Sequence, residues 1–343
     1  MGKNWEGPIA AVVLSVCGLA GVGLVSLAQS RDMATMKAEY KRPPARPVKD
    51  QAIIDLGRQL FWDPRVSGSG KTACVTCHLP YLGYGVTEKN SRMDSGRIAS
   101  RKSQPLLGMR HVPIYGWDGR NPSLEMHAKN AMLTGAMSMT GPNVAQPVKV
   151  EVVEGRIRNI PEFAAQFAAL EAPVNVDMIA KAIAVYERSL EPGVAPFDHW
   201  IEGDESAISE SAKRGFILFN TKANCSSCHS GWRLTDDGFH DIGTSTTDLG
   251  RGSQLKDVTL LQYAFKTPTL RSVALRPPFM HNSSAATLYD VVKHYEKGGI
   301  DRPSRSPMMK PLKLSEEERL DLVAFMQTLT GVPEGEDPPA LPK

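Results

Sequence analysis

The sequence predicts an all-α fold made of two tandem domains with long loops. Apolar residues recur every 3.6 positions over residues 176–190 and 315–329, whereas the alternating pattern of strands is scarce. The chain also contains an internal repeat, because residues 57–61 (GRQLF) correspond to residues 215–219 (GFILF) and each segment precedes a C-x-x-C-H motif. Helical periodicity and this repeat together favour two similar helical domains.

Both C-x-x-C-H motifs have the form of covalent c-type haem attachment. Their residues are Cys74, Cys77, His78, Cys225, Cys228 and His229. Two thiols at this spacing each add to one porphyrin vinyl group, and the adjoining imidazole reaches the iron as its proximal ligand. Zinc knuckles and redox dithiols also use C-x-x-C, but neither needs a histidine directly after the second cysteine. The motifs therefore predict two haem c groups in two cytochrome c-like domains.

Composition places the chain among ordinary globular proteins. Of its 343 residues, 41% are hydrophobic and 22% are charged, which suffices for two domains with their own cores and does not predict disorder. The formal net charge is only +3, and the basic residues form no tract. Neither observation predicts a nucleic-acid partner.

Residues 9–28 are almost wholly apolar and about as long as one membrane span. They predict export and a periplasmic location, which suits c-type haem because its attachment takes place outside the bacterial cytoplasmic membrane. The Ser26-Leu27-Ala28 sequence resembles a cleavage site, whereas the length of the apolar run suits an anchor. A signal peptide and a membrane anchor both stay open, and membrane contact is expected only through this segment.

The remaining boundaries follow composition and periodicity. Prolines among basic residues predict an extended linker, apolar residues at helical spacing start the folded part at Gln51, and the polar residues 202–205 suggest a domain boundary. Ser315 and Glu318 form a capping-box pattern that predicts the start of the last helix. We expect an anchor or signal peptide, a linker, an N-terminal haem domain, a C-terminal haem domain and a tail over residues 1–30, 31–50, 51–202, 203–332 and 333–343.

Three later motifs give a resemblance to a known family. Residues 117–120 (WDGR) lie between the attachment motifs, and residues 266–271 (KTPTLR) and 278–281 (PFMH) follow the second one. Over residues 51–331 this order resembles the bacterial di-haem cytochrome c peroxidases and MauG, the methylamine-utilisation enzyme. The resemblance implies that hydrogen peroxide reacts at the N-terminal haem and that Trp117 relays electrons to a six-coordinate C-terminal haem. It also implies haem contacts for His281 and, through a propionate, for Arg120.

The sixth ligand of the C-terminal haem divides this family. The peroxidases carry a methionine fourteen residues after the histidine of the Pro-x-x-His motif, and MauG carries a tyrosine there. Counting from His281 reaches Tyr295, so the resemblance implies a MauG-like haem ligated by His229 and Tyr295. A phenolate donates charge to iron and stabilises high oxidation states. The rivals for this position that lie nearby in sequence are His294, Met280, Met308 and Met309.

The distal side of the N-terminal haem departs from the family pattern. Family members carry a glutamine ten residues and a glutamate twenty residues after the tryptophan, and the glutamate assists proton movement. Here these places hold His127 and Met137, and residues 131–148 contain no acid. His127 is the candidate for the acid–base function, whereas Met137 or Met139 is the candidate for a ligand that closes the iron. A packing role for His127 stays open.

Family members also bind calcium between their domains, through an asparagine side chain and two backbone carbonyls near the Pro-x-x-His motif. The asparagine position corresponds to Lys102, which cannot ligate calcium, although its ammonium can take the place of the ion's charge. The carbonyls of Arg276 and Pro278 remain available. Calcium is therefore left open beside the two covalent haem c groups.

The residues and the resemblance together predict an exported, hydrogen-peroxide-dependent di-haem oxidoreductase. Its haems are expected to share oxidising equivalents through Trp117 and to oxidise a redox partner protein, either a protein substrate or a small cytochrome or cupredoxin donor. A non-enzymatic electron-transfer protein is the first alternative, because a methionine cap would make both haems six-coordinate. A di-haem oxygenase acting on an apolar polymer or a lipid is the second alternative.

Overall fold

The computed structural model describes residues 32–44, 49–139, 147–331 and 337–343. Residues Met33–Lys343 form one unit of the structure, which contains all the elements named below. The apolar segment 9–28 lies outside the described residues. Within the described ranges, none of the helices has the length and apolar character needed to cross a membrane.

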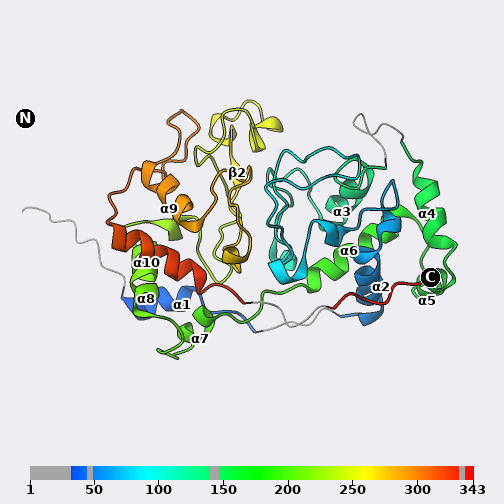
Figure 1. Cartoon of the computed structure of the whole chain (residues 1–343), viewed down its shortest axis with the longest axis horizontal. Coiled ribbons are helices and arrows are strands. Elements are labelled where there is room, and N and C mark those ends of the chain that lie inside the picture. Colours follow the sequence, from blue (N-terminus) through cyan, green and yellow to red (C-terminus); the bar gives the residue numbers. More distant parts are fainter. Residues whose placement is uncertain (1–31, 45–48, 140–146, 332–336) are drawn as a thin grey trace, which may run out of the picture. The chain divides into compact units, whose positions relative to one another are not determined.

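Helices dominate the described part of the chain, as predicted (Figure 1). They are α1 (Met33–Glu39), α2 (Gln51–Trp62), α3 (Leu124–Leu133), α4 (Val150–Arg158), α5 (Pro161–Ala169), α6 (Val176–Ser189), α7 (Pro196–Ile201), α8 (Glu210–Asn220), α9 (Leu288–Lys297) and α10 (Glu316–Gln327). Two short strands, β1 (Phe239–His240) and β2 (Phe265–Lys266), pair antiparallel. Short 3-10 turns hold both attachment motifs, at Cys74–Thr76 and Cys225–Ser227.

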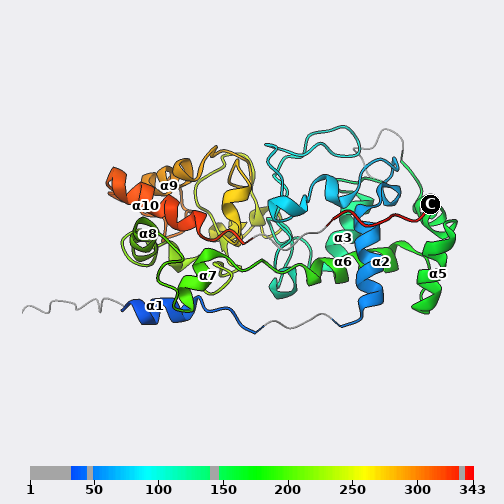
Figure 2. The same cartoon turned by 60° about the horizontal axis from the view of Figure 1, so that its bottom comes forward.

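The first hydrophobic core forms around α2, α3 and α6, and its buried side chains run from Ile53 to Leu190. Helix α2 crosses α6, and α3 packs against α6 (Figure 2). The crossing is close at Gly57, where a Cβ atom would lie 2.0 Å from the carbonyl oxygen of Ala182. Glycine is required here because any side chain would push the two backbones apart.

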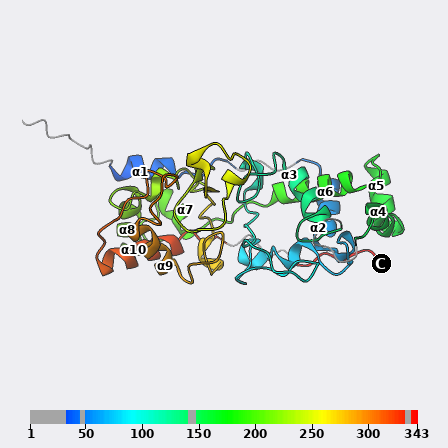
Figure 3. The same cartoon turned by 90° about the horizontal axis from the view of Figure 1, so that it is seen from above.

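The second core repeats this arrangement. Helix α8 packs against α10, and α9 lies beside α10 (Figure 3). A Cβ atom at Gly215 would lie 1.9 Å from the carbonyl oxygen of Asp321, so this crossing is as close as the one at Gly57. Helix α10 begins at the predicted capping box of Ser315 and Glu318. The predicted last helix is thus confirmed.

The internal repeat extends to the predicted haem ligands. Phe61 lies 6.5 Å from His78 between ring centroids, with an interplanar angle of 49°. Phe219 lies 6.5 Å from His229, with an angle of 48°. In each copy a glycine sets the helix crossing, and a phenylalanine one turn later packs on the histidine. The two repeats therefore fold in the same way around their attachment motifs.

The linker and the domain boundary differ from the sequence-based expectation. Residues 33–44 are not an extended tether, because α1 is helical and Tyr40 is fully buried in the second core, with its hydroxyl 2.7 Å from Asn220 Oδ1. The buried Phe197 and Trp200 place α7 in the same core. The packing boundary therefore falls before α7, because its aromatic side chains, rather than the polar residues 202–205, decide where it packs.

The C-terminal residues 337–343 return to the first core. The guanidinium of Arg58 donates to the carbonyl of Asp337 at 2.7 Å, and that of Arg65 donates to the carbonyl of Pro342 at 2.6 Å. Figure 1 shows this segment passing α2. The predicted tail is thus held through its backbone, which explains the lack of a sequence signal, since every residue offers a carbonyl.

Candidate haem sites and their junction

Each attachment motif begins with a turn that brings its two cysteines together. The amide of Cys77 donates to the carbonyl of Cys74 at 3.1 Å, and the amide of Cys228 donates to that of Cys225 at 3.2 Å. The histidine follows directly in both motifs. One turn of chain therefore supplies two sulfur atoms and an imidazole, as covalent haem attachment requires.

Both motif histidines are held with Nε2 available for a metal. His78 Nδ1 donates to the carbonyl of Tyr84 at 3.0 Å, and His229 Nδ1 donates to that of Leu234 at 2.9 Å. A carbonyl only accepts, so each Nδ1 carries the proton and each Nε2 keeps its lone pair. Burial lowers the pKa of both rings. Each ring is therefore oriented so that Nε2 can serve as a metal ligand.

The first cysteine of each motif, Cys74 or Cys225, has a buried thiol. Burial raises the pKa of Cys225 to about 12, and it raises the pKa of Cys74 still further. A zinc site or a reactive dithiol needs thiolates, which a positive or polar environment stabilises. These surroundings suit thioether links to a buried apolar group.

A cavity of about 370 Å³ adjoins the second motif. It is lined by Cys225, Cys228 and His229 on one side and by Tyr295 from α9. Much of the remaining wall is apolar: Phe219, Leu288, Val291, Val292, Leu322 and Met326. An apolar cavity with two thiols and an imidazole at its edge fits a covalently attached porphyrin.

Three buried cations line the same cavity: Lys102, Lys266 and Arg276. Their side chains donate to backbone carbonyls, and none forms an ion pair with a carboxylate of the described residues. Burial lowers the pKa of both lysines to about 8 and that of Arg276 to about 10. Buried cations need anionic partners, and the carboxylates of haem propionates are the partners that this site calls for.

His281 supplies a further polar atom to the cavity. Its ring stacks on Phe265, with 3.6 Å between the centroids. Its Nε2 is buried and has no hydrogen-bond partner among the described residues, although buried polar atoms are almost always paired. A bound group with polar edges, such as a haem, supplies that partner. This placement agrees with the cofactor contact expected for His281.

Trp117 lies at the junction of the two domains. It lines the cavity of the second motif, and its ring lies 6.2 Å from that of His281. The indole Nε1 donates to the carbonyl of Lys102 at 2.7 Å, and the Trp117 carbonyl accepts from the amide of Lys266 at 2.8 Å. The N-terminal domain thus fixes the indole and the C-terminal domain fixes the backbone of this residue, which suits the relay expected from the sequence.

Lys102 occupies the place considered for calcium. Its ammonium donates to the carbonyls of Arg276 and Pro278, at 3.1 and 2.7 Å, and its own amide donates to the carbonyl of His281 at 2.8 Å. These are the two carbonyls that the family resemblance assigned to the ion. The lysine thus supplies the positive charge at this junction.

Comparisons with known proteins agree with this geometry. Residues 51–206 match the sequence profile described as di-haem cytochrome c peroxidase, and residues 212–330 match that of cytochrome c. The methylamine utilization protein MauG of Methylorubrum extorquens is 40% identical over 346 aligned residues, covering 97% of this chain and 94% of the relative. The chain belongs to the di-haem cytochrome c peroxidase family.

Two further comparisons place this di-haem peroxidase among its relatives. A cytochrome c peroxidase of Denitromonas iodatirespirans is 35% identical over 84% of each chain. The crystal structure of a MauG-like protein associated with microbial copper homeostasis has a TM-score of 0.75 at 25% identity, covering 85% of this chain and 94% of that one. The protein is therefore a peroxide-dependent oxidoreductase with two covalent haem c groups in tandem cytochrome c-like domains.

The C-terminal cavity of the di-haem peroxidase brings Tyr295 together with most of its rivals. Met280, Met308 and Met309 also line the cavity. His294 instead donates from Nε2 to the carbonyl of Ile242 at 2.8 Å, which occupies the atom that a ligand would use. Tyr295 lines the same cavity as the attachment cysteines, and burial is the largest cause that raises its pKa. Ligation by Tyr295 stays a prediction.

Arg120 lies away from the cavity lining. Its side chain is 57% exposed and its guanidinium forms an ion pair with Asp118, which also pairs with Arg101 at 2.8 Å. These two arginines hold the pKa of Asp118 far below its usual range. The propionate contact expected for Arg120 stays a prediction, and the buried Arg276 is the arginine that the structure brings to the cavity.

His127 lines a small pocket of about 30 Å³ whose wall combines residues of the N-terminal domain, such as Tyr115, with residues of the C-terminal domain, such as Lys266. Its Nδ1 is bonded to the side chain of Asn121 at 2.7 Å. Burial is the main cause that lowers the pKa of His127 to about 4. Sequence reasoning missed Asn121, since an asparagine six residues before a histidine is no recognised motif.

The two methionines considered as iron caps are both buried in the first core. Met137 Sδ lies 3.7 Å from Cys74 Sγ, so this side chain packs at the attachment edge of the haem site. Glu125, the acid of α3, forms an ion pair with Arg188 at 2.6 Å. The two positions at which family members carry the distal glutamine and glutamate therefore hold the imidazole of His127 and the thioether of Met137, and the carboxylate of Glu125 is paired with Arg188.

Glu187 is a buried acid that sequence reasoning missed. It lies on α6 at 6% exposure, burial raises its pKa to about 8, and it is among the groups that raise the pKa of the Cys74 thiol. One carboxyl oxygen has no hydrogen-bond partner among the described residues. The signal was its spacing, since Glu187 follows Ile183 by four residues on the apolar face of α6.

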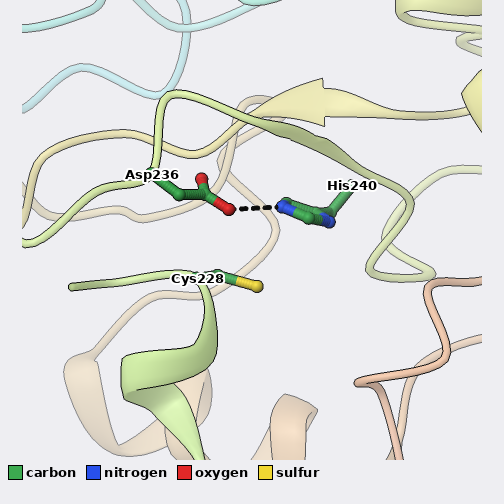
Figure 4. Close-up of side chains that lie close together, drawn as sticks. All are labelled: Cys228, Asp236 and His240. Atoms are coloured by element: carbon green, nitrogen blue, oxygen red, sulfur yellow. Dashed lines mark hydrogen bonds and ion pairs between the residues drawn. The ribbon is translucent and has the colours of Figure 1, made fainter.

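A group of Cys228, Asp236 and His240 resembles a metal site, because their ligand atoms lie within 4.8 Å of one another (Figure 4). Cys228 belongs to the second attachment motif, so the group forms part of the haem site. The remaining pair is joined at 2.7 Å, and the bond to Asp236 is the largest cause that raises the pKa of His240 to about 10. A positive imidazole therefore stands at this edge of the C-terminal haem site.

Proposed function

We propose that hydrogen peroxide reacts in the N-terminal haem site, that oxidising equivalents pass through Trp117 to the C-terminal haem, and that they oxidise a redox partner protein. The haems supply the iron that peroxide oxidises. The single observation that carries the proposal is the placement of Trp117, which lines the C-terminal cavity and is bonded through its indole to Lys102 of the N-terminal domain.

Residues of the chain hold and connect the two haems. His78 and His229 offer Nε2 to the irons, because their Nδ1 protons are used by backbone carbonyls. Tyr295 is the proposed sixth ligand of the C-terminal haem, where a phenolate lowers the reduction potential and favours storage of an oxidising equivalent. His127 is the proposed residue that contacts peroxide.

The proposed partner is a protein substrate or a small cytochrome or cupredoxin donor. We place the reaction in the periplasm, since residues 9–28 predict export and c-type haem is attached outside the cytoplasmic membrane. Both proposals follow from the sequence and from the family to which the chain belongs.

Low-temperature EPR of the ferric holoprotein, before and after one equivalent of peroxide, tests the proposal. One high-spin and one low-spin signal are expected, and peroxide is expected to remove both. In Trp117→Phe, with both haems retained, peroxide should still act on the high-spin haem while the low-spin signal persists. Trp62→Phe is the matched control, since its indole Nε1 has no partner among the described residues.

A non-enzymatic electron-transfer protein is the second candidate, and the placement of Met137 beside Cys74 favours it. A sulfur ligand on the N-terminal iron would leave both haems six-coordinate and low-spin. Two low-spin signals that peroxide leaves unchanged, in the ferric and in the half-reduced protein, would establish this candidate and refute the peroxidase proposal.

A further inference from the structure

A short chain of hydrogen bonds ends on His127. Asn130 Nδ2 donates to Asn121 Oδ1 at 2.7 Å, and Asn121 Nδ2 lies 2.7 Å from His127 Nδ1. Asn121 is only 3% exposed, so its side-chain amide is committed to these two neighbours. His127 and Asn130 are one turn apart on α3, which directs both side chains toward Asn121.

This chain of hydrogen bonds has a direction. The carbonyl oxygen of Asn121 accepts from Asn130, so its NH₂ group faces His127. An NH₂ group only donates, and His127 Nδ1 must therefore accept. A neutral imidazole whose Nδ1 accepts carries its proton on Nε2. The ring therefore carries an N–H at Nε2, the nitrogen that is not bonded to Asn121.

The surroundings of His127 keep the ring neutral. Burial is the largest cause that lowers its pKa, the neighbouring basic groups His78, Lys266 and Arg120 lower it further, and Asp118 raises it. The Tyr115 ring lies 6.4 Å away, but its hydroxyl donates to a backbone carbonyl, so it leaves Nε2 alone. Among the described residues, neither a carboxylate nor the Tyr115 hydroxyl is hydrogen-bonded to His127 Nδ1, whose partner is Asn121.

We propose that Asn121 and Asn130 are positioning residues that hold His127 as its Nε2–H tautomer, and that His127 donates this N–H to peroxide in the N-terminal haem site. The location of peroxide rests on the proposed function. A donor at this point stabilises the negative charge that develops on the peroxide oxygen as the O–O bond lengthens. His127 is then a catalytic residue that acts as a donor, and it does not accept the proton of peroxide.

The carbon monoxide complex of the ferrous, full-length holoprotein tests the tautomer without turnover. An N–H that points at bound carbon monoxide lowers the C–O stretching frequency, so His127→Leu is expected to raise it. In Asn121→Asp the carboxylate accepts from Nδ1–H, and Nε2 keeps a proton only while the ring is cationic. The frequency should then rise with pH in this variant and stay constant in the wild type. Frequencies that match the wild type in both variants would overturn the proposal.

Stopped-flow reaction with peroxide separates a donor from a base. The amide of glutamine donates but does not take up a proton, so His127→Gln should keep the rate within about tenfold, whereas His127→Leu should lose about 10²-fold. Equal losses in the two variants would contradict the donor role. Asn121→Leu should slow the wild type but have no further effect in the His127→Leu background, because Asn121 acts through His127.

These measurements also keep the inference apart from the proposed function. A wild-type holoprotein that does not react with peroxide would refute the proposed function. The infrared result would still decide whether Asn121 fixes the tautomer of His127. A wild type that reacts with peroxide but shows no donor effect on carbon monoxide would refute the inference alone.

Discussion

Glu187 gives the stability of this protein a measurable dependence on pH. Burial raises the pKa of its carboxyl from 4.5 to about 8. Between these values the folded protein keeps a proton that the unfolded chain has released. The stabilisation is therefore fully present below pH 4.5 and is lost as the pH rises to about 8. At about 1.36 kcal/mol per pH unit, the loss amounts to about 5 kcal/mol.

Glu187→Gln removes this titration at almost constant volume. Between about pH 5 and pH 8 the wild type is expected to lose about 3.5 kcal/mol more free energy of unfolding than the variant. Guanidinium unfolding of the holoprotein at several pH values measures this difference. Glu125→Gln is the matched control, because Arg188 lowers the pKa of Glu125 and moves its titration below this range. Equal pH dependence in the wild type and Glu187→Gln would refute the assignment.

Three further predictions concern the helix crossing, the junction and the C-terminal haem. Gly57→Ala should lower the free energy of unfolding by about 1–3 kcal/mol, because its Cβ would meet a carbonyl at 2.0 Å. Gly155→Ala in α4 should raise this free energy by about 0.5–1 kcal/mol, since no atom lies within 4 Å of the added Cβ. Thermal unfolding checks both variants. A calcium chelator should leave the peroxide reaction of the wild type unchanged, whereas Lys102→Asn should become calcium-dependent, as rates with and without the ion would show. Tyr295→Met should raise the reduction potential of the C-terminal haem in a spectroelectrochemical titration, and an unchanged potential would exclude Tyr295 as its ligand.

The parts of the fold that the sequence predicted are those that local patterns determine. Helices α6 and α10 follow apolar periodicity, and the start of α10 follows a capping box whose two residues are three positions apart. The place of α1 was not predictable, because its core contact depends on Tyr40 reaching Asn220, 180 residues along the chain. Tertiary packing determines the conformation of such segments, whatever their proline content.

The same division applies to the candidate sites. The predicted attachment cysteines and proximal histidines lie within single pentapeptides, so a local pattern is enough to predict them. The N-terminal pocket instead combines His127 with Lys266, which comes from the other domain. The tautomer of His127 is proposed to depend on its hydrogen bond to Asn121. An asparagine belongs to no motif at this spacing, so the sequence gives no signal of that tautomer.

Lys102 shows how one residue changes the electrostatics of a site while the same backbone carbonyls remain its hydrogen-bond acceptors. The carbonyls of Arg276 and Pro278, which the family resemblance assigned to a divalent ion, accept from the Lys102 ammonium. An ion stabilises a fold by mass action and leaves when its concentration falls, whereas a lysine side chain is always present. The junction thereby carries one positive charge fewer beside Trp117, whose indole is bonded to the carbonyl of the same lysine. We therefore expect the position of Trp117 to be independent of the supply of calcium, and its electrostatic environment to be less positive than a divalent ion would make it.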